Sequence, residues 1–208
     1  MTTRRGLFIT LEGGEGAGKS TAARNLAEIL RAEGQTVVLT REPGGTPVAE
    51  AIRALLLDAE TPLDALAQTM LHFSARADHV GKLIRPALAR GEIVICDRFY
   101  DSTMAYQAFG QGVDIAAVAS LIRLIDLKPD ITFMLELPQS TANKRRAARA
   151  GAEDRYERMG AEVMARIALG FRSIAAAEPC RCVMVDARRK PDEVAAFLRQ
   201  AIRERAGR

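Results

Sequence analysis

Short apolar runs alternate with longer amphipathic segments along this chain. Apolar runs rich in β-branched residues predict five buried strands, at residues 7–11, 36–40, 92–97, 131–137 and 182–186. Apolar residues at helical spacing predict helices, at residues 22–33, 48–58, 63–90, 115–126, 162–177 and 191–205. The long stretch at 63–90 leaves room for a break. This alternation predicts βαβ units in one α/β domain spanning residues 1–208, with a five-stranded parallel sheet flanked by helices.

Polar and glycine-rich segments follow four of the predicted strands. Functional groups in such sheets gather at the carboxyl ends of the strands. We therefore expect one cleft formed by residues 13–20, the loop after Thr40, the pair Asp97-Arg98 and the loop after Leu137.

The segment after the first strand matches the phosphate-binding pattern G-x-x-x-x-G-K-[ST], and it reads Gly13-Gly14-Glu15-Gly16-Ala17-Gly18-Lys19-Ser20. Glycines let several backbone N–H groups approach phosphate oxygens. Lys19 can reach the β- and γ-phosphates, Ser20 can ligate Mg²⁺, and Thr21 adds a second hydroxyl. A plain glycine turn without a ligand would need neither Lys19 nor Ser20. The segment predicts a site for a nucleoside triphosphate and its Mg²⁺.

Glu15 is unexpected inside an anion-binding loop, because its carboxylate repels phosphate. We expect another partner for it, such as magnesium-bound water or a substrate hydroxyl. The alternative is a solvated residue at the tip of the loop.

The third predicted strand ends in Asp97, which is followed directly by Arg98. An acid at this position helps to hold Mg²⁺ in nucleotide-binding proteins. The guanidinium of Arg98 suits binding of a phosphate through paired hydrogen bonds. A structural ion pair at a strand end is the alternative.

Residues 41–46 form a glycine turn after the second strand and can bring Arg41 toward a second phosphate, although Pro-Gly-Gly also occurs in ordinary loops. Farther along the chain, residues 141–160 are rich in arginine, including Arg145, Arg149 and Arg155. A solvated basic helix face is one interpretation. A short lid that carries an arginine to the transferring phosphoryl group is the other.

A group of aromatic, basic and hydroxyl side chains is suited to bind a nucleobase or its sugar. Its members are Phe73, Arg76, Tyr100, Ser102, Thr103, Tyr106 and Gln107. Phe73 and Arg76 lie three residues apart on a predicted helix and hence near one face. For Phe73, packing in the core is the alternative.

Composition narrows the function classes. The chain has 208 residues, of which 48% are hydrophobic, and a net charge of +4. A basic balance fits nucleic acid or polyphosphate ligands, but the basic residues are not interleaved with aromatics and no nucleic-acid motif is present. We therefore favour the polyphosphate interpretation. Three cysteines without metal or CxxC spacing predict a reducing cytoplasm, and no segment predicts a membrane span.

These residues resemble bacterial thymidylate kinases over almost the whole chain. The resemblance lies in residues 11–21, 40–46, 75–80, 97–102, 105–107, 129–130 and 154–157. The phosphate loop is common to many families, whereas Arg-Glu-Pro-Gly-Gly-Thr together with Asp-Arg-x-x-x-Ser is specific.

The resemblance implies a P-loop NTPase-like α/β fold, transfer of a phosphoryl group from ATP to dTMP, and a homodimer. It places Glu15 near the acceptor sugar and magnesium, Arg98 at the dTMP phosphate, and Arg76 at the thymine carbonyl. Tyr106 would fill the space that a ribose 2′-hydroxyl needs.

Further residues follow from the resemblance. Thr103 takes a place near the base, and the catalytic arginine comes from the lid segment, since the phosphate loop has Glu15 instead of an arginine. The stacking aromatic of the family falls at His72, one residue before Phe73, so either ring is a candidate. Two rival functions stay open, another small-molecule kinase on the same core and an ATP-dependent nucleic-acid-binding protein.

Overall fold

The computed structural model describes residues 5–147, 155, 156 and 158–206. Its strands are β1 (Phe8–Glu12), β2 (Val37–Arg41), β3 (Ile93–Asp97), β4 (Ile131–Glu136) and β5 (Cys182–Asp186). They form one parallel sheet in the order β2-β3-β1-β4-β5. Each predicted strand is found within one residue at either end, because continuous apolar runs between helices specify buried parallel strands.

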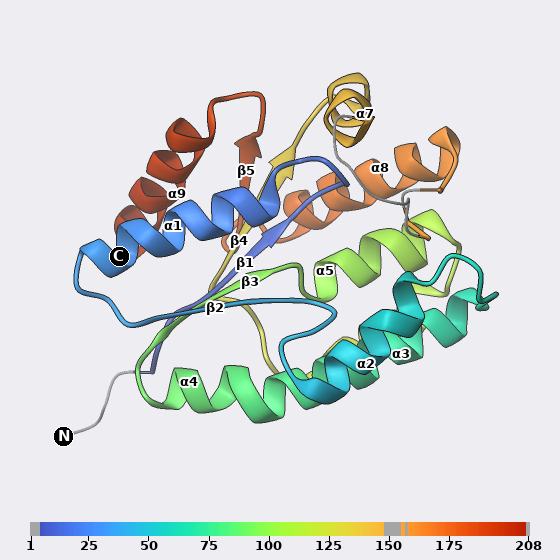
Figure 1. Ribbon diagram of the computed structural model, residues 1–208, viewed down its shortest axis with the longest axis horizontal. Helices are drawn as coiled ribbons and strands as arrows, with labels where there is room; N and C mark the ends of the chain where they lie inside the picture. Colours follow the sequence, from blue (N-terminus) through green and yellow to red (C-terminus); the bar gives the residue numbers. More distant parts are fainter. Residues whose placement is uncertain (1–4, 148–154, 157, 207–208) are drawn as a thin grey trace.

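Helices cover both faces of this sheet (Figure 1). They are α1 (Lys19–Ala32), α2 (Pro47–Leu57), α3 (Ala65–His79), α4 (Arg85–Ala89), α5 (Tyr100–Thr103), α6 (Ile115–Ile125), α7 (Gln139–Ala147), α8 (Ala161–Ala177) and α9 (Pro191–Ala206). Helices α1 and α9 lie side by side on one face, and α3, α4, α6 and α8 cover the other. The expected α/β fold, with a parallel sheet flanked by helices, is confirmed.

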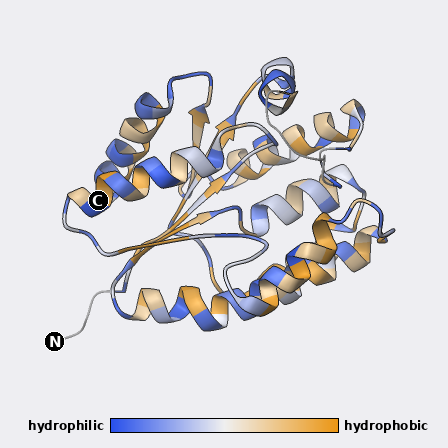
Figure 2. Ribbon diagram, viewed as in Figure 1, coloured by the Kyte–Doolittle hydropathy of each residue, from blue (hydrophilic) through white to orange (hydrophobic). Residues whose placement is uncertain are grey.

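The sheet is the apolar centre of the molecule, as its orange strands in Figure 2 show. Alternate side chains of β1 pack against the helices on opposite faces of the sheet. Ile9 and Leu11 pack under α1 and α9, whereas Phe8 packs with α4 and α6. All three are fully buried. This two-sided burial holds β1 rigidly in the middle of the sheet, where the loop that follows it gains a fixed base.

The expected long helix at 63–90 is continuous but changes its winding. A π-helical segment, η1 (Val80–Ile84), joins α3 to α4. Pro86 has no N–H group for a bond to the preceding turn, which accounts for irregular winding before it. The sequence pattern missed α5 with the π-helical η2 (Met104–Gly110), and it left α7 within the expected lid. Across the described residues, no helix has both the length and the apolar character that crossing a membrane requires.

Candidate active site

A cavity of about 650 Å³ opens at the carboxyl ends of the strands. It lies where β1 has β3 on one side and β4 on the other, the crevice in which parallel sheets bind ligands. Most of the predicted site residues line it, namely Glu15, Gly16, Ala17, Gly18, Lys19, Ser20, Thr21, Arg41, Arg76, Asp97, Arg98, Ser102, Thr103, Tyr106 and Gln107. Gly13 and Gly14 line a smaller hollow beside the loop. The cavity thus brings together most of the residues expected to form one cleft, whereas Gly13, Gly14 and the start of the loop after Leu137 line the neighbouring hollow.

The phosphate loop connects β1 to α1 in the predicted way. Gly18 precedes the helix with a φ of +87°, and a Cβ atom on Gly13 would lie 2.4 Å from the carbonyl oxygen of Leu135. Both positions therefore require glycine. Lys19 is the first residue of α1, and its ammonium donates to the Gly14 carbonyl at 2.8 Å. Burial and the nearby charge of Arg98 lower the pKa of Lys19 to about 8.

Ser20 and Asp97 meet next to this loop. The Ser20 hydroxyl donates to Oδ2 of Asp97, while Oδ1 of Asp97 is buried with no hydrogen-bond partner among the described residues. Mg²⁺ prefers oxygen ligands and is commonly held by one or two protein groups together with substrate phosphates. An unsatisfied carboxylate oxygen beside a hydroxyl fits that preference. The described residues contain no group of three or more His, Cys, Asp or Glu side chains suited to a metal.

Arg98 is the centre of a second polar cluster. Its backbone is left-handed, with a φ of +71°, which turns the side chain toward the phosphate loop. Nη1 donates to the Gly13 carbonyl and to the Ser102 hydroxyl, both at 3.0 Å. Nη2 donates to Oε1 of Glu15 at 2.5 Å and to the Tyr106 hydroxyl at 3.3 Å. The Tyr106 hydroxyl also donates to Glu15, at 3.1 Å. Glu15 thus has partners within the site and is not a solvated loop tip.

Glu12 is a buried carboxyl behind this cluster for which the sequence raised no expectation. It accepts from the Phe99 amide at 2.7 Å and from the Ser102 hydroxyl at 2.5 Å. Burial and the charge of Asp101 raise the pKa of Glu12 to about 8, against the opposing effect of these hydrogen bonds. Glu12 therefore holds the Ser102 hydroxyl beside Arg98 while favouring its own protonated form.

The raised pKa of Glu12 predicts a pH effect on stability. Between its usual 4.5 and about 8, the folded chain binds a proton that the unfolded chain releases. Glu12 therefore contributes stability below pH 4.5, and this contribution is lost as the pH rises to about 8. Glu12→Gln removes the titration, so we expect the variant to gain free energy of unfolding relative to the native chain between pH 5 and pH 8. Urea denaturation at several pH values measures it.

Glu204→Gln serves as the control, because it makes the same change of side chain at an exposed position of α9 that does not line the cavity. If the free energy of unfolding changes with pH in the same way in Glu12→Gln and in the native chain, the raised pKa of Glu12 is contradicted.

Arg76 lies at the other end of the cavity and is 2% exposed. Its Nε donates to Oε2 of Glu42 at 2.7 Å, and its Nη2 donates to the Thr103 hydroxyl at 3.1 Å. Nη1 has no hydrogen-bond partner within the described residues. A buried donor without a partner is costly, which makes Nη1 of Arg76 a candidate donor to a ligand.

The two candidate rings, His72 and Phe73, occupy different places. Phe73 is 5% exposed, packs in the core under the Arg76 guanidinium, and does not line the cavity. His72 lines the cavity, and its Nε2 lies 2.7 Å from the Tyr156 hydroxyl. The expected placement of Phe73 in the acceptor site is therefore corrected. Successive helical residues point about 100° apart, and α3 turns His72 rather than Phe73 to the cavity.

The expected lid arginines differ in what they contact. Arg149 lies outside the described residues. Arg155 does not line the cavity, because its side chain donates to the carbonyls of Leu56 and Asp58 at the end of α2. Arg145, from α7, lines the cavity and donates to the Ala187 carbonyl at 3.1 Å. Arg53 and Arg189 also line it, although no motif in the sequence singled them out.

A phosphate-loop fold with a second set of arginines beyond the loop defines the class of P-loop kinases that phosphorylate small acceptors. The family model described as thymidylate kinase matches residues 11–198. The chain belongs to the thymidylate kinase family.

Individual relatives agree with this placement. The thymidylate kinase of Gluconobacter oxydans is 53% identical over 204 residues, covering 96% of this chain and 95% of the relative. That of Pseudomonas fluorescens strain SBW25 is 51% identical over 185 residues, covering 88% of each chain. The crystal structure of the Ehrlichia chaffeensis thymidylate kinase has a TM-score of 0.80 at 35% identity and covers 95% of this chain and 99% of that one. The expected family, fold and dTMP kinase activity are confirmed.

Proposed function

We propose that the cavity holds ATP and dTMP with their phosphates facing each other between Lys19 and Arg98. The observation that carries this arrangement is the Arg98 cluster, which joins the phosphate loop to the acceptor side through Glu15 and Tyr106. ATP places its triphosphate on residues 13–21. The acceptor phosphate lies at Arg98 and Arg41, and the base lies toward Arg76, Thr103 and Gln107.

In this arrangement the protein needs no strong base, because the acceptor is already a phosphate anion. Lys19 neutralises charge on the transferring group, and Arg98 aligns the acceptor phosphate for in-line attack. Ser20 and Asp97 would hold Mg²⁺, which supplies further neutralisation of the phosphate oxygens when bound. Glu15, held by Arg98 and Tyr106, faces the acceptor sugar, where Tyr106 leaves no room for a 2′-hydroxyl.

The arginine that stabilises the transferring group comes, in this proposal, from residues 141–160. Arg149 and Arg155 are the residues expected from the sequence. Among the described arginines of this segment, Arg145 is the one that lines the cavity. A Cβ atom placed on Gly18 would lie 3.9 Å from its Nη1, so its guanidinium is next to the phosphate loop. We propose Arg145 as an additional contact to the triphosphate.

Turnover with ATP and a panel of monophosphates tests the acceptor assignment. We expect dTMP to be preferred over dUMP, dCMP and dGMP in a coupled assay of ADP release. Equal turnover of the four acceptors would refute the arrangement of the base site.

His72 is the residue we propose to stack on thymine. Burial, followed by the charges of Arg76, Arg98 and Arg53, lowers the pKa of His72 to about 3, so the ring is neutral at ordinary pH. Stacking of a base on an aromatic ring is worth about 1–3 kcal/mol, so His72→Ala should raise KM for dTMP at least about fivefold. His72→Phe keeps a flat ring and should retain most of the affinity. Steady-state kinetics with varied dTMP measures both variants, and an unchanged KM in His72→Ala would contradict the role.

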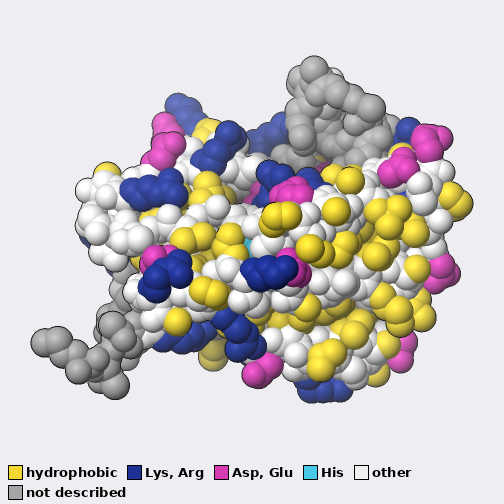
Figure 3. All heavy atoms as spheres, turned by 60° about the horizontal axis from the view of Figure 1, so that its bottom comes forward, with side chains coloured by type: hydrophobic (Ala, Val, Ile, Leu, Met, Phe, Trp, Pro, Cys, Tyr) yellow, Lys and Arg dark blue, Asp and Glu magenta, His cyan; other side chains and the backbone are white. Residues whose placement is uncertain are grey.

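A homodimer in the cytoplasm completes the proposal. Large hydrophobic side chains are exposed on the face formed by α2 and α3, where Figure 3 shows them gathered, and also on α6. They are Val48, Leu55, Leu66, Met70, Ile115 and Leu124. Exposed apolar side chains that gather on one face are typical of a protein–protein interface. The free cysteines Cys96, Cys180 and Cys182 fit a reducing compartment.

A further inference from the structure

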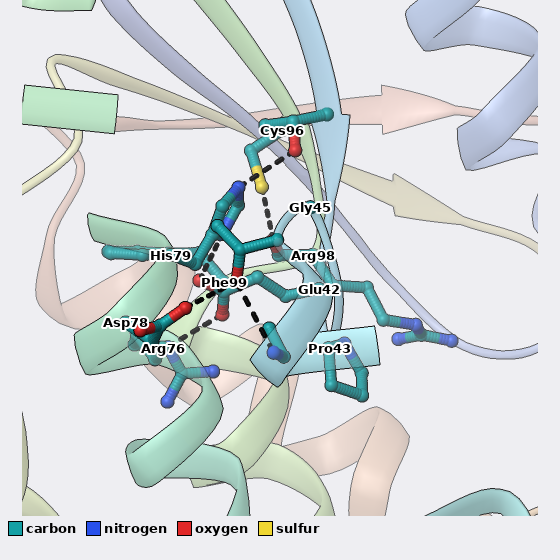
Figure 4. Close-up of polar contacts among 12 residues, drawn as sticks. Glu42, Pro43, Gly45, Arg76, Asp78, His79, Cys96, Arg98 and Phe99 are labelled. Atoms are coloured by element: carbon teal, nitrogen blue, oxygen red, sulfur yellow. Dashed lines mark hydrogen bonds and ion pairs between the residues drawn. The ribbon is translucent and has the colours of Figure 1, made fainter. Parts of the chain in front are cut away.

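A buried polar network lies behind the acceptor end of the cavity. Its members Glu42, Arg76 and His79 are 4%, 2% and 0% exposed. Glu42 and Arg76 line the cavity, whereas His79 lies one layer behind them. Figure 4 shows Arg76 and His79, three residues apart on α3, both directed toward the carboxylate of Glu42. The cluster is unusual for a core, because burial of charged groups is costly unless each has a partner.

The hydrogen bonds of the network can be assigned a direction. Glu42 accepts from Nε of Arg76 through Oε2, and its Oε1 lies 3.1 Å from Nδ1 of His79. Because Glu42 also pairs with the guanidinium of Arg76, its Oε1 accepts and Nδ1 of His79 donates. The other ring nitrogen, Nε2, lies 2.8 Å from the Thr40 hydroxyl. Thr40 on β2 thus holds the ring from its other side, and His79 occupies one oxygen of Glu42.

This occupancy determines how Arg76 is presented. Arginine and carboxylate side chains tend to form two parallel hydrogen bonds. Here Glu42 accepts only from Nε, since His79 has taken its other oxygen, and Nη2 is left for Thr103. Nη1 has no partner within the described residues, and Arg76 lines the cavity. A Glu42 released by His79 would turn both oxygens to the guanidinium and draw Nη2 away from Thr103.

The same histidine also holds the loop at residues 42–46. A Cβ atom on Gly45 would lie 2.4 Å from Nε2 of His79, so the loop backbone is packed directly on the ring. The neighbouring residue Asp78 accepts from the Thr46 hydroxyl at 2.5 Å. The end of α3 therefore fixes both Arg76 and the loop that carries Glu42 into the cavity.

We propose that His79 is a positioning residue for recognition of the nucleobase, acting through Glu42 on Arg76. It does not touch substrate. It keeps one carboxylate oxygen occupied so that the guanidinium presents Nη1 to a carbonyl oxygen of the pyrimidine. This inference rests on the proposed contact between Arg76 and the base.

Two substitutions separate positioning from packing. His79→Leu removes the donor to Glu42 and keeps an apolar side chain of comparable bulk. We expect the Kd for dTMP, measured by calorimetry, to rise about tenfold, with the Kd for ATP unchanged. His79→Asn places an amide N–H close to the position of Nδ1 and should recover most of the affinity. The ratio of the Kd for dCMP to that for dTMP should fall in His79→Leu, because dCMP carries an amino group where dTMP has a carbonyl.

Gln68 provides the matched control. It is a polar side chain of α3, 5% exposed, that bonds to Leu63 and Gln111 and does not line the cavity. Gln68→Leu should lower the melting temperature without changing the Kd for dTMP. If His79→Leu does not fold, Thr40→Val tests the same network by removing the hydroxyl that holds the His79 ring at Nε2. We expect about a threefold rise in the Kd for dTMP in that variant.

The outcomes distinguish this inference from the proposed function. An unchanged Kd for dTMP in His79→Leu, or in Thr40→Val where the first variant does not fold, overturns the inference. Equal losses in His79→Leu and His79→Asn also overturn it, in favour of a packing role. Arg76→Gln tests the proposed base contact by itself. If the Kd for dTMP is unchanged there, the base contact fails, and with it the reason for positioning Arg76.

Discussion

Replacement of Lys19 by alanine is expected to lower kcat on the order of 10³-fold while the chain stays folded. Lys19 is 6% exposed at the first turn of α1, where its ammonium can meet the oxygens of the transferring phosphoryl group. Burial already opposes its charge, since the pKa is lowered to about 8. Removing the charge therefore relieves the folded state of a desolvated cation and costs it one hydrogen bond to Gly14. Coupled turnover at saturating ATP and dTMP measures the loss.

Lys128 serves as the control for this prediction. It is an exposed lysine paired with Glu178, and Lys128→Ala should leave kcat unchanged. Turnover of Lys19→Ala within about tenfold of the native chain would contradict the role given to the ammonium.

The lowered pKa of Lys19 adds a pH dependence to the same prediction. In the free enzyme the ammonium is charged below about pH 8 and loses its proton above it. We expect kcat/KM for ATP to fall above that pH, whereas kcat reports the ATP-bound enzyme, in which phosphate charges favour the ammonium. Lys19→Arg keeps its charge and should lack this decline. A decline of the same size in Lys19→Arg would assign it to another group.

Local patterns were sufficient to predict the sheet and the phosphate loop. A buried parallel strand and a glycine loop each follow from neighbouring residues, so β3 and the segment from Gly13 to Ser20 could be placed without knowledge of the fold. Asp97 and Arg98 could be added because the carboxyl ends of parallel strands share one edge of the sheet. Short segments of the chain are therefore enough to predict the donor site.

Sequence reasoning failed where long-range packing chooses between neighbours. Phe73 is the better stacking residue by type, yet the rotation of α3 against the core turns His72 to the cavity. Arg181, just before β5, forms a buried ion pair with Asp101, eighty residues away, which no local pattern indicates. The buried polar network of Glu42, Arg76 and His79 likewise joins residues that no local pattern connects.

These buried polar contacts share a physical role. Each restricts a side chain in or behind the site, and each is satisfied only when distant elements meet. Glu12 behind Ser102 and Glu42 behind Arg76 act in this similar way. Most residues that line the cavity could be predicted by type, whereas the buried residues that hold them depend on the fold.

Substitution of Arg98 by lysine is expected to lower kcat/KM for dTMP about 10²-fold, although the charge is retained. Arg98 donates to four groups, those of Gly13, Ser102, Glu15 and Tyr106, from two nitrogens of a planar fork. A lysine ammonium has three donors on a flexible stem and cannot hold Glu15 and Ser102 while binding a phosphate at two oxygens. Because the role proposed for Arg98 is to align the attacking phosphate, both a lower kcat and a higher KM for dTMP should result.

Arg85 offers a matched control, because it also donates from a guanidinium to two acceptors, the carbonyls of Ile125 and Asp126, away from the cavity. Arg85→Lys should leave kcat/KM for dTMP unchanged. In Arg98→Lys, steady-state kinetics should show KM for ATP close to that of the native chain. A rise confined to KM for ATP would place Arg98 on the donor instead. Whether KM rises for dTMP or for ATP therefore shows which of the two phosphates Arg98 binds.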